Sequence, residues 1–162
     1  MTVNMYGSNP RELDDLLGSL DPDERGRTRL LDAHKNTQMQ ELSINRMPQT
    51  SWGTIDWERL PPLERREVRL FEEAERLLTE WIRKYFSPDF PVVIFWGNLV
   101  VPSVEMPSVA AANHSDEILD TGYDLWIFGP KDAVLIEYYH EGTMTVWRVP
   151  ARCDADAVDH ST

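Results

Sequence analysis

The sequence predicts an α+β fold in which a mixed or antiparallel sheet, ending in a three-stranded meander, packs against one long amphipathic helix. Two features carry this prediction. Apolar residues recur at helical spacing through residues 61–86, and β-rich segments separated by turn signals occupy residues 123–149. A chain of 162 residues has room for one core with an arm, whereas two full cores would be cramped.

We expect an N-terminal helical arm and connector over residues 1–60, a core α+β domain over residues 61–150 and a flexible polar tail over residues 151–162. Prolines and glycines between residues 48 and 62 break regular structure, so the connector separates the arm from the core.

The arm carries two helix signals and one strand signal. Leucines at helical spacing predict a short amphipathic helix over residues 8–20, which must dock either on its own domain or on a partner. Asp21, Pro22 and Glu24 are typical of a second helix start, with Asp21 as the cap and Glu24 completing a capping box. Residues 36–48 alternate loosely between apolar and polar side chains, which favours a short strand.

The connector contains three large apolar residues, Trp52, Ile55 and Trp57. We expect them to pin the connector to the core. The alternative is that the two tryptophans form a binding surface, because aromatic rings provide a large contact area at a low cost in conformational entropy.

A long helix over residues 61–86 is the clearest element. Pro61 and Glu64 are typical of a helix start, and Pro88 marks the stop. The i,i+4 ion pairs on its polar side are worth only about 0.3–0.5 kcal/mol each. Burial of the apolar stripe must therefore hold this helix in place.

After this helix the pattern changes to short apolar runs. Residues 92–96 predict a strand, which continues over residues 99–101 after a turn signal or a bulge. Residues 108–120 predict a helix. The residues of this helix expected to face inward are Val109, Ala112 and Ile118.

Three consecutive antiparallel strands are expected at residues 123–128, 133–139 and 143–149. Gly142 lies in the second turn, at a position that favours positive φ. Alternation along the last strand places Thr145, Trp147 and Val149 on one face, and Met144, Val146 and Arg148 on the other.

Acidic residues dominate the C-terminal half. The chain has a formal net charge of −12, and residues 87–162 contain 3 basic and 12 acidic side chains, a net charge of −9. Such a surface repels phosphate, so we expect no direct binding to nucleic acid or to anionic membranes. It can steer a basic protein partner onto itself; the alternative is that the carboxylates only keep the protein soluble.

Membrane and secretion signals are also missing from the sequence. No apolar run approaches the roughly 18 residues of a membrane-spanning helix. The first residues lack the basic start and apolar core of a secretory signal. The sequence has a single cysteine, so it cannot form an internal disulfide bond. We therefore expect a cytoplasmic location.

Motifs for catalysis, metal binding or cofactor binding are not found. The histidines (His34, His114, His140 and His160) lack zinc-ligand spacing, and the isolated glycines form no phosphate-binding loop. Aspartates flank Cys153, and nearby carboxylates raise the pKa of a thiol, which argues against a reactive nucleophile. We expect no cofactor, no metal site and no catalytic residue.

Tyr123 to Phe128 form a strand with the sequence Tyr-Asp-Leu-Trp-Ile-Phe, followed by an apolar strand that ends near Tyr138 and by Gly142. This arrangement resembles the closing motif of an uncharacterised actinomycete domain family, although Gly129 stands where that family usually has an aspartate. Residues 30–42 resemble the family's N-terminal helix and following strand more weakly. Members are often encoded beside helix-turn-helix regulators, so the resemblance implies a non-enzymatic regulatory accessory and transfers no catalytic residue.

We predict a non-enzymatic, acidic protein-interaction domain that binds a basic protein partner. An immunity or antitoxin-like protein and an accessory to a DNA-binding regulator would both fit. The expected contact residues are Asp116, Glu117, Asp120, Asp124, Glu137 and Glu141. Two alternatives stay open: a small enzyme without a recognisable motif, and a phage or virion assembly component held by the N-terminal arm.

Overall fold

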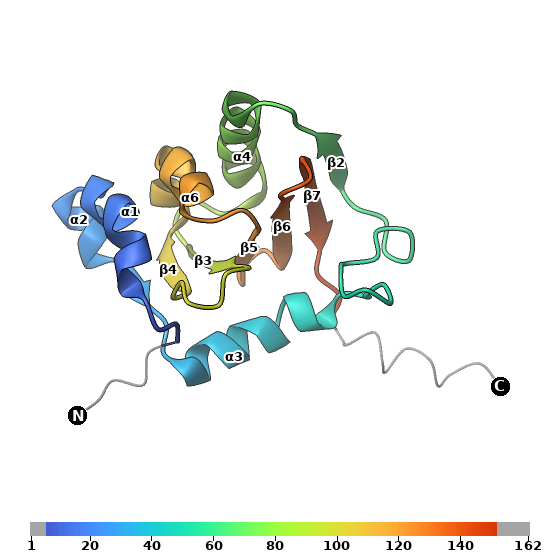
Figure 1. Ribbon diagram of the computed structural model, residues 1–162, viewed down its shortest axis with the longest axis horizontal. Helices are drawn as coiled ribbons and strands as arrows, with labels where there is room; N and C mark the ends of the chain where they lie inside the picture. Colours follow the sequence, from blue (N-terminus) through green and yellow to red (C-terminus); the bar gives the residue numbers. More distant parts are fainter. Residues whose placement is uncertain (1–5, 152–162) are drawn as a thin grey trace.

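A seven-stranded sheet forms the centre of the protein (Figure 1), whose computed structural model describes residues 6–151. The strand order is β1-β4-β3-β5-β6-β7-β2, and every neighbouring pair is antiparallel. The strands are β1 (Arg29–Leu30), β2 (Glu64–Glu67), β3 (Pro91–Trp96), β4 (Val104–Pro107), β5 (Leu125–Gly129), β6 (Val134–Tyr139) and β7 (Thr143–Arg148). The α+β class, the antiparallel sheet and the meander β5–β6–β7 are therefore confirmed.

Helices pack on both faces of this sheet. One face carries α1, α4, α5 and α6, whereas α3 and the connector lie against the other (Figure 1). In the described residues the α-helices are α1 (Asp14–Ser19), α2 (Pro22–Gly26), α3 (Ala33–Glu41), α4 (Phe71–Tyr85), α5 (Ser108–Asn113) and α6 (Ser115–Thr121), and the 3-10 helices are η1 (Pro10–Leu13) and η2 (Ile44–Arg46). None of the helices between residues 6 and 151 is long and apolar enough to cross a membrane.

The larger part of the hydrophobic core lies between α4 and the sheet. Helix α4 contributes the buried residues Ala74, Leu78, Trp81 and Ile82. The strands contribute a row of fully buried cross-strand neighbours, Ile94, Ile127, Ile136 and Val146. Burying each large apolar side chain contributes about 1.5–3 kcal/mol, so this packing outweighs the surface ion pairs of the helix.

The N-terminal arm docks on its own domain. Leu13 and Leu16 are fully buried in the main core, and α1 packs beside α6. The second helix begins as predicted: Glu24 donates its backbone N–H to Asp21 Oδ1 at 2.7 Å, and Asp21 donates its own to Glu24 Oε1 at 3.0 Å. The apolar stripe of the arm therefore has its partner within the chain.

The prediction of one long helix over residues 61–86 is wrong in its first third. Residues Glu64–Glu67 form β2, an edge strand that pairs with β7, and the helix begins only at Phe71. Backbone bonds from Leu63 to Val146 (2.7 Å) and from Val68 to Gly142 (2.7 Å) extend the pairing. The apolar stripe starts after this strand, so hydrogen bonding to β7 decides the structure of the polar residues before it.

The prediction of a strand over residues 36–48 is also wrong. Helix α3 occupies Ala33–Glu41, and η2 follows it. The carboxylate of Asp32 accepts a hydrogen bond of 2.7 Å from the backbone N–H of Lys35 and caps the helix. Met39 packs on the second face of the sheet, so tertiary burial and the cap override the weak alternation.

The region between residues 97 and 122 differs from the prediction in two places. The strand expected at residues 99–101 is a loop, and β4 lies further on at Val104–Pro107. The helix expected over residues 108–120 is divided at His114, whose φ of −121° and ψ of 31° are not helical. Ala112 and Ile118 are buried as expected, but Val109 is 50% exposed.

The meander keeps its predicted faces and turn. Met144 and Val146 join the core beneath α4, while Trp147 and Val149 join the cluster on the opposite face. Gly142 has a φ of +92°, as the turn requires. Cys153 and the rest of the tail after residue 151 lie outside the described residues.

The connector only partly follows the prediction that it is pinned by its large side chains. Ile55 is buried against the second face of the sheet, but Trp52 is 77% exposed and Trp57 is 43% exposed. The prediction that the connector side chains pack against the core is therefore confirmed for Ile55 and wrong for Trp52. The exposed tryptophans border a cavity on this face.

Candidate partner-binding site

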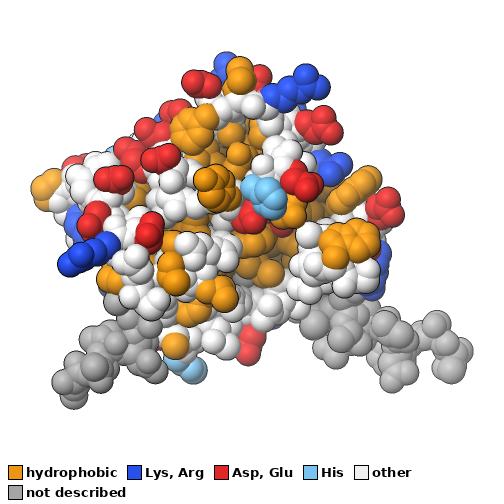
Figure 2. All heavy atoms as spheres, viewed as in Figure 1, with side chains coloured by type: hydrophobic (Ala, Val, Ile, Leu, Met, Phe, Trp, Pro, Cys, Tyr) orange, Lys and Arg blue, Asp and Glu red, His pale blue; other side chains and the backbone are white. Residues whose placement is uncertain are grey.

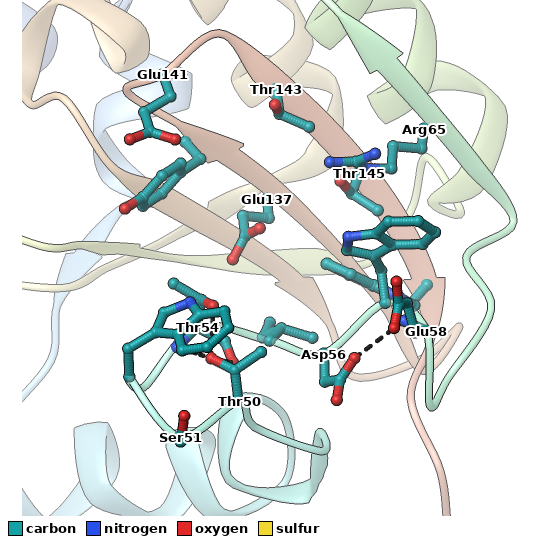
Figure 3. A pocket seen from close by; sticks show the side chains of 15 residues that line it. Thr50, Ser51, Thr54, Asp56, Glu58, Arg65, Glu137, Glu141, Thr143 and Thr145 are labelled. Carbon is teal, nitrogen blue, oxygen red and sulfur yellow. Dashed lines mark hydrogen bonds between the residues drawn. The ribbon is translucent and has the colours of Figure 1, made fainter.

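A cavity of about 560 Å³ lies between the connector and the strands β6, β7 and β2 (Figure 3). We call this cavity the acidic groove. It is lined by Thr50, Ser51, Trp52, Thr54, Ile55, Asp56, Trp57, Glu58, Arg65, Glu137, Tyr139, Glu141, Thr143, Thr145 and Trp147. Figure 2 shows the same side of the molecule as Figure 1, with a hollow near its centre where hydrophobic and acidic side chains meet.

The sheet side of the groove is built by a row of cross-strand neighbours. Trp126 lies opposite Glu137, Glu137 opposite Thr145, and Thr145 opposite Arg65. Successive side chains of a strand point to opposite faces, so these residues share the face turned away from α4. The register of the sheet thus brings together residues that are far apart in the sequence.

Glu137 lies half-buried in the centre of this row. The indole Nε1 of Trp126 donates a hydrogen bond of 2.7 Å to its Oε2. The pKa of Glu137 is raised from 4.5 to about 7. Burial is the largest cause and the charge of Asp124 adds to it, while the bond from Trp126 and the charge of Arg65 oppose the rise. The effect of Arg65 is the smallest of the four causes, so the one cation that acts on this carboxylate within the described part of the chain compensates it only weakly.

Arg65 instead lies against an aromatic ring. Its guanidinium carbon is 4.5 Å from the centre of the Trp57 ring, at cation–π distance. This contact joins the edge strand β2 to the connector across one end of the groove.

The connector is held in shape by its own hydrogen bonds. Thr50 and Thr54 join their hydroxyl groups at 2.8 Å, and Gln49 forms an antiparallel bridge with Ile55. Trp147 anchors the end of the segment, since its indole Nε1 donates to the carbonyl oxygen of Leu60 at 3.0 Å. The wall that carries Trp52 is therefore a structured loop.

The charge of the groove is acidic. Among residues 6–151, its lining contains four carboxylates, Asp56, Glu58, Glu137 and Glu141, and one cation, Arg65. Low-dielectric walls focus the electric field of such a set of charges, which favours the binding of a positively charged group.

The six contact residues predicted from the sequence lie in two places. Glu137 and Glu141 line the groove, and Asp124 lies beside it, where its carboxylate accepts from the backbone N–H of His140 at 2.8 Å. Asp116, Glu117 and Asp120 lie on α6, which packs on the opposite face of the sheet. The structure therefore divides the predicted acidic face into a groove half and a helix half.

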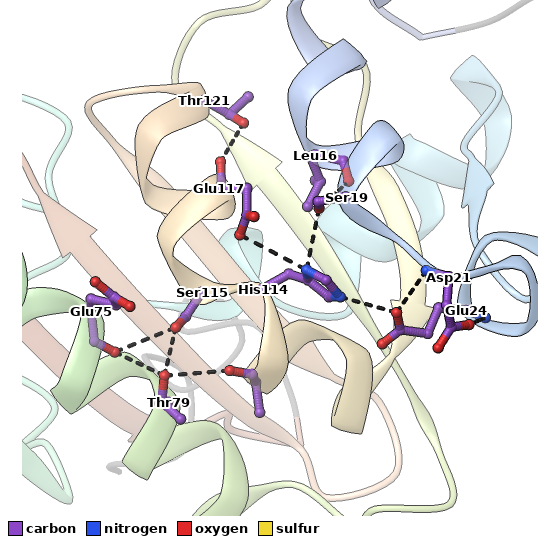
Figure 4. Close-up of polar contacts among 11 residues, drawn as sticks. Leu16, Ser19, Asp21, Glu24, Glu75, Thr79, His114, Ser115, Glu117 and Thr121 are labelled. Atoms are coloured by element: carbon purple, nitrogen blue, oxygen red, sulfur yellow. Dashed lines mark hydrogen bonds and ion pairs between the residues drawn. The ribbon is translucent and has the colours of Figure 1, made fainter.

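In the helix half, Glu117 belongs to an internal network (Figure 4). His114 Nε2 lies 3.0 Å from Glu24 Oε1, and His114 Nδ1 lies 3.2 Å from Ser19 Oγ and 3.9 Å from Glu117 Oε2. Burial raises the pKa of Glu117, whereas a hydrogen bond with Glu117 lowers the pKa of Asp116. These contacts tie the N-terminal arm to the break between α5 and α6.

Arg65 lines the groove although it was not predicted as a site residue, and Trp52, which we expected to pack inward, is exposed. The available signal was the presence of two tryptophans in a segment rich in Gly and Pro, which favoured a binding surface as the alternative. Arg65 gave no such signal, because it was expected on a helix. Within residues 6–151, no group of three or more His, Cys, Asp or Glu side chains is arranged to hold a metal ion.

Comparison with known protein families gives a match over most of the chain. Residues 24–147 match the family model described as CdiI immunity protein EcoliA0-like. No curated protein matches the chain. A family of immunity proteins confirms the expectation that the chain is not an enzyme and agrees with the immunity-like role predicted above, whereas actinomycete origin and neighbouring regulators stay predictions.

Proposed function

The chain belongs to the CdiI immunity protein EcoliA0-like family, and from this membership we propose that it binds a protein toxin in the cytoplasm and neutralises it. The proposed contact surface is the acidic groove together with Asp124 at its margin. We further propose that the toxin presents a basic segment to this surface. The regulator-accessory role is the second candidate, supported by the sequence resemblance alone.

The observation that carries the choice of surface is the position of Glu137. Its carboxylate is half-buried in a groove whose lining also includes two exposed tryptophans and three more carboxylates, and within residues 6–151 Arg65 is the one cation that acts on it, weakly. Aromatic residues in the centre of an interface contribute much of its binding energy, and complementary charge speeds association. The groove offers both on one structured surface.

The N-terminal arm supports the same choice. Leu13 and Leu16 are fully buried in the core of their own domain, so these two leucines of the apolar stripe are not available to a second chain. This arrangement disfavours the alternative in which the arm holds the protein in a virion or another assembly.

Capture followed by neutralisation tests the proposal. The tagged chain is used to capture proteins from the lysate of its native host at low and at high salt, and the captured protein is identified. We expect a basic protein that is retained at low salt and lost at high salt. That protein should stop growth when expressed alone, and co-expression of this chain should restore growth.

Two results would contradict the proposal. One is a captured partner that has no toxicity in the absence of this chain. The other is a toxic partner whose retention does not change with salt, which would leave the immunity role in place and remove the basic character of the partner.

A further inference from the structure

Glu137 has hydrogen-bonding capacity in the acidic groove that its contacts among the described residues do not use. Oε2 of Glu137 accepts a hydrogen bond from Trp126, and among residues 6–151 its carboxylate has no second hydrogen bond. An ionised carboxylate has about four lone-pair sites for hydrogen bonds. Figure 3 shows the carboxylate directed into the cavity rather than toward the sheet.

The aromatic walls of the groove select a planar cation. Trp57 already has the guanidinium of Arg65 at 4.5 Å from its ring centre, so this wall is compatible with a stacked guanidinium. Trp52 lines the same groove and is 77% exposed, so its ring is accessible to a ligand. Arginine stacks on aromatic faces and pairs bidentately with carboxylates, whereas lysine is a compact point charge without a planar face.

Arg65 does not itself use this hydrogen-bonding capacity of Glu137. Its guanidinium lies against Trp57, and Thr145 stands between Arg65 and Glu137 in the cross-strand row. The charge of Arg65 is the weakest influence on Glu137. The groove therefore has a carboxylate and an exposed indole that the guanidinium of Arg65 does not bridge.

We propose that the acidic groove receives an arginine side chain of the toxin, with its guanidinium paired to Glu137 and stacked against Trp52. This inference rests on the proposed function, because it names the group by which the toxin enters that site. It makes Glu137 the residue that determines specificity for a guanidinium.

Titration with blocked tripeptides tests the inference without the toxin. The full chain is titrated with acetyl-Gly-Arg-Gly-amide and with peptides that carry lysine or the neutral isostere citrulline in place of arginine. The signals followed are the indole N–H resonances of Trp52, Trp57 and Trp126. We expect saturable shifts at Trp52 and Trp126 with the arginine peptide, weaker binding of the lysine peptide and no saturable shift with citrulline.

Two variants locate the binding. Glu137→Gln keeps the shape and the acceptor for Trp126, and we expect it to weaken the arginine peptide about tenfold or more, because a charge-assisted hydrogen bond becomes a neutral one. Asp120→Asn removes a charge from α6 on the other face and should leave binding unchanged. The Trp126 indole signal in the free Glu137→Gln variant reports whether the groove has kept its structure.

Three results would overturn the inference: no saturable shift with the arginine peptide, equal binding of citrulline, or unchanged binding to Glu137→Gln. A lysine peptide that binds as tightly as arginine would overturn the assignment to a guanidinium. Failure of this titration leaves toxin capture and growth rescue unaffected, whereas failure of the proposed function appears in those two assays, so the two failures are distinguishable.

Discussion

Trp126 and Glu137 lie directly opposite each other on β5 and β6, and the indole of Trp126 donates a hydrogen bond of 2.7 Å to the Glu137 carboxylate. The bond provides a donor to one of the two carboxylate oxygens. It does not fully offset the burial of the group, because the pKa of Glu137 still rises to about 7. A carboxylate held in this way costs folding stability when it is charged, which is typical of a group kept for binding.

The raised pKa of Glu137 predicts a specific dependence of stability on pH. Burial raises the pKa of Glu137 from 4.5 to about 7 on folding, so folding takes up a proton between these values. The free energy of unfolding therefore falls, through this group, as the pH rises across that range. Glu137→Gln removes the effect, so we expect the variant to match the wild type near pH 5 and to be about 2 kcal/mol more stable near pH 8.

Urea denaturation of both proteins at the two pH values measures this difference. A stability difference that stays the same at both pH values would contradict the assignment of a raised pKa to Glu137.

The docked arm predicts a contrast between neighbouring leucines. Leu16 is fully buried, whereas Leu17 is only partly buried beside the same core. Leu16→Ala leaves a cavity, and we expect it to lower the free energy of unfolding by about 2–5 kcal/mol. Leu17→Ala is the matched control and should cost clearly less. Equal losses in thermal or chemical unfolding would mean that the arm does not pack as described.

Gly142 is required by both the turn and the edge strand. Its φ is +92°, and an added Cβ would lie 2.6 Å from the carbonyl oxygen of Val68. Gly142→Ala should therefore destabilise the protein by more than about 1 kcal/mol and weaken the pairing of β2 with β7. Gly26→Ala is the control, because nothing lies within 4 Å of its added Cβ. Amide exchange at residues 64–68 reads out the pairing, and unchanged exchange in Gly142→Ala would refute it.

The two halves of the predicted acidic face can be compared by equal changes of charge. Glu58→Lys with Glu141→Lys alters the groove, and Asp116→Lys with Asp120→Lys alters α6. We expect the groove pair to slow association with the captured toxin about tenfold and to flatten its dependence on salt, because long-range attraction is lost. The α6 pair should leave the kinetics close to those of the wild type. If only the α6 pair slowed association, the contact surface would lie on the other face of the sheet.

Much of the fold could be predicted because local pattern and final structure agree. The meander has clear alternation and a glycine in its turn, and the apolar stripe of α4 leaves one arrangement that buries it. The strand β2 could not be predicted in this way. Its sequence Glu-Arg-Arg-Glu has no apolar face, and its structure depends on β7, which lies about 80 residues later in the chain.

The site was predictable to a similar degree. The meander alone places Glu137 near Asp124 and Glu141, so an acidic cluster there follows from the sequence. The contributions of Trp52, Trp57 and Arg65 depend on how the connector returns across the sheet, which no local pattern specifies. Likewise, the sequence gives no sign that α6 faces the opposite side of the sheet from Glu137.

The central claim is that the acidic groove is the toxin-binding surface, and amide exchange of the complex tests it most directly. The chain is measured free and with the captured toxin bound. We predict slower exchange at residues 50–58 and 137–145, with no change at residues 115–121. Protection confined to residues 115–121, with residues 50–58 and 137–145 exchanging as in the free protein, would contradict this claim.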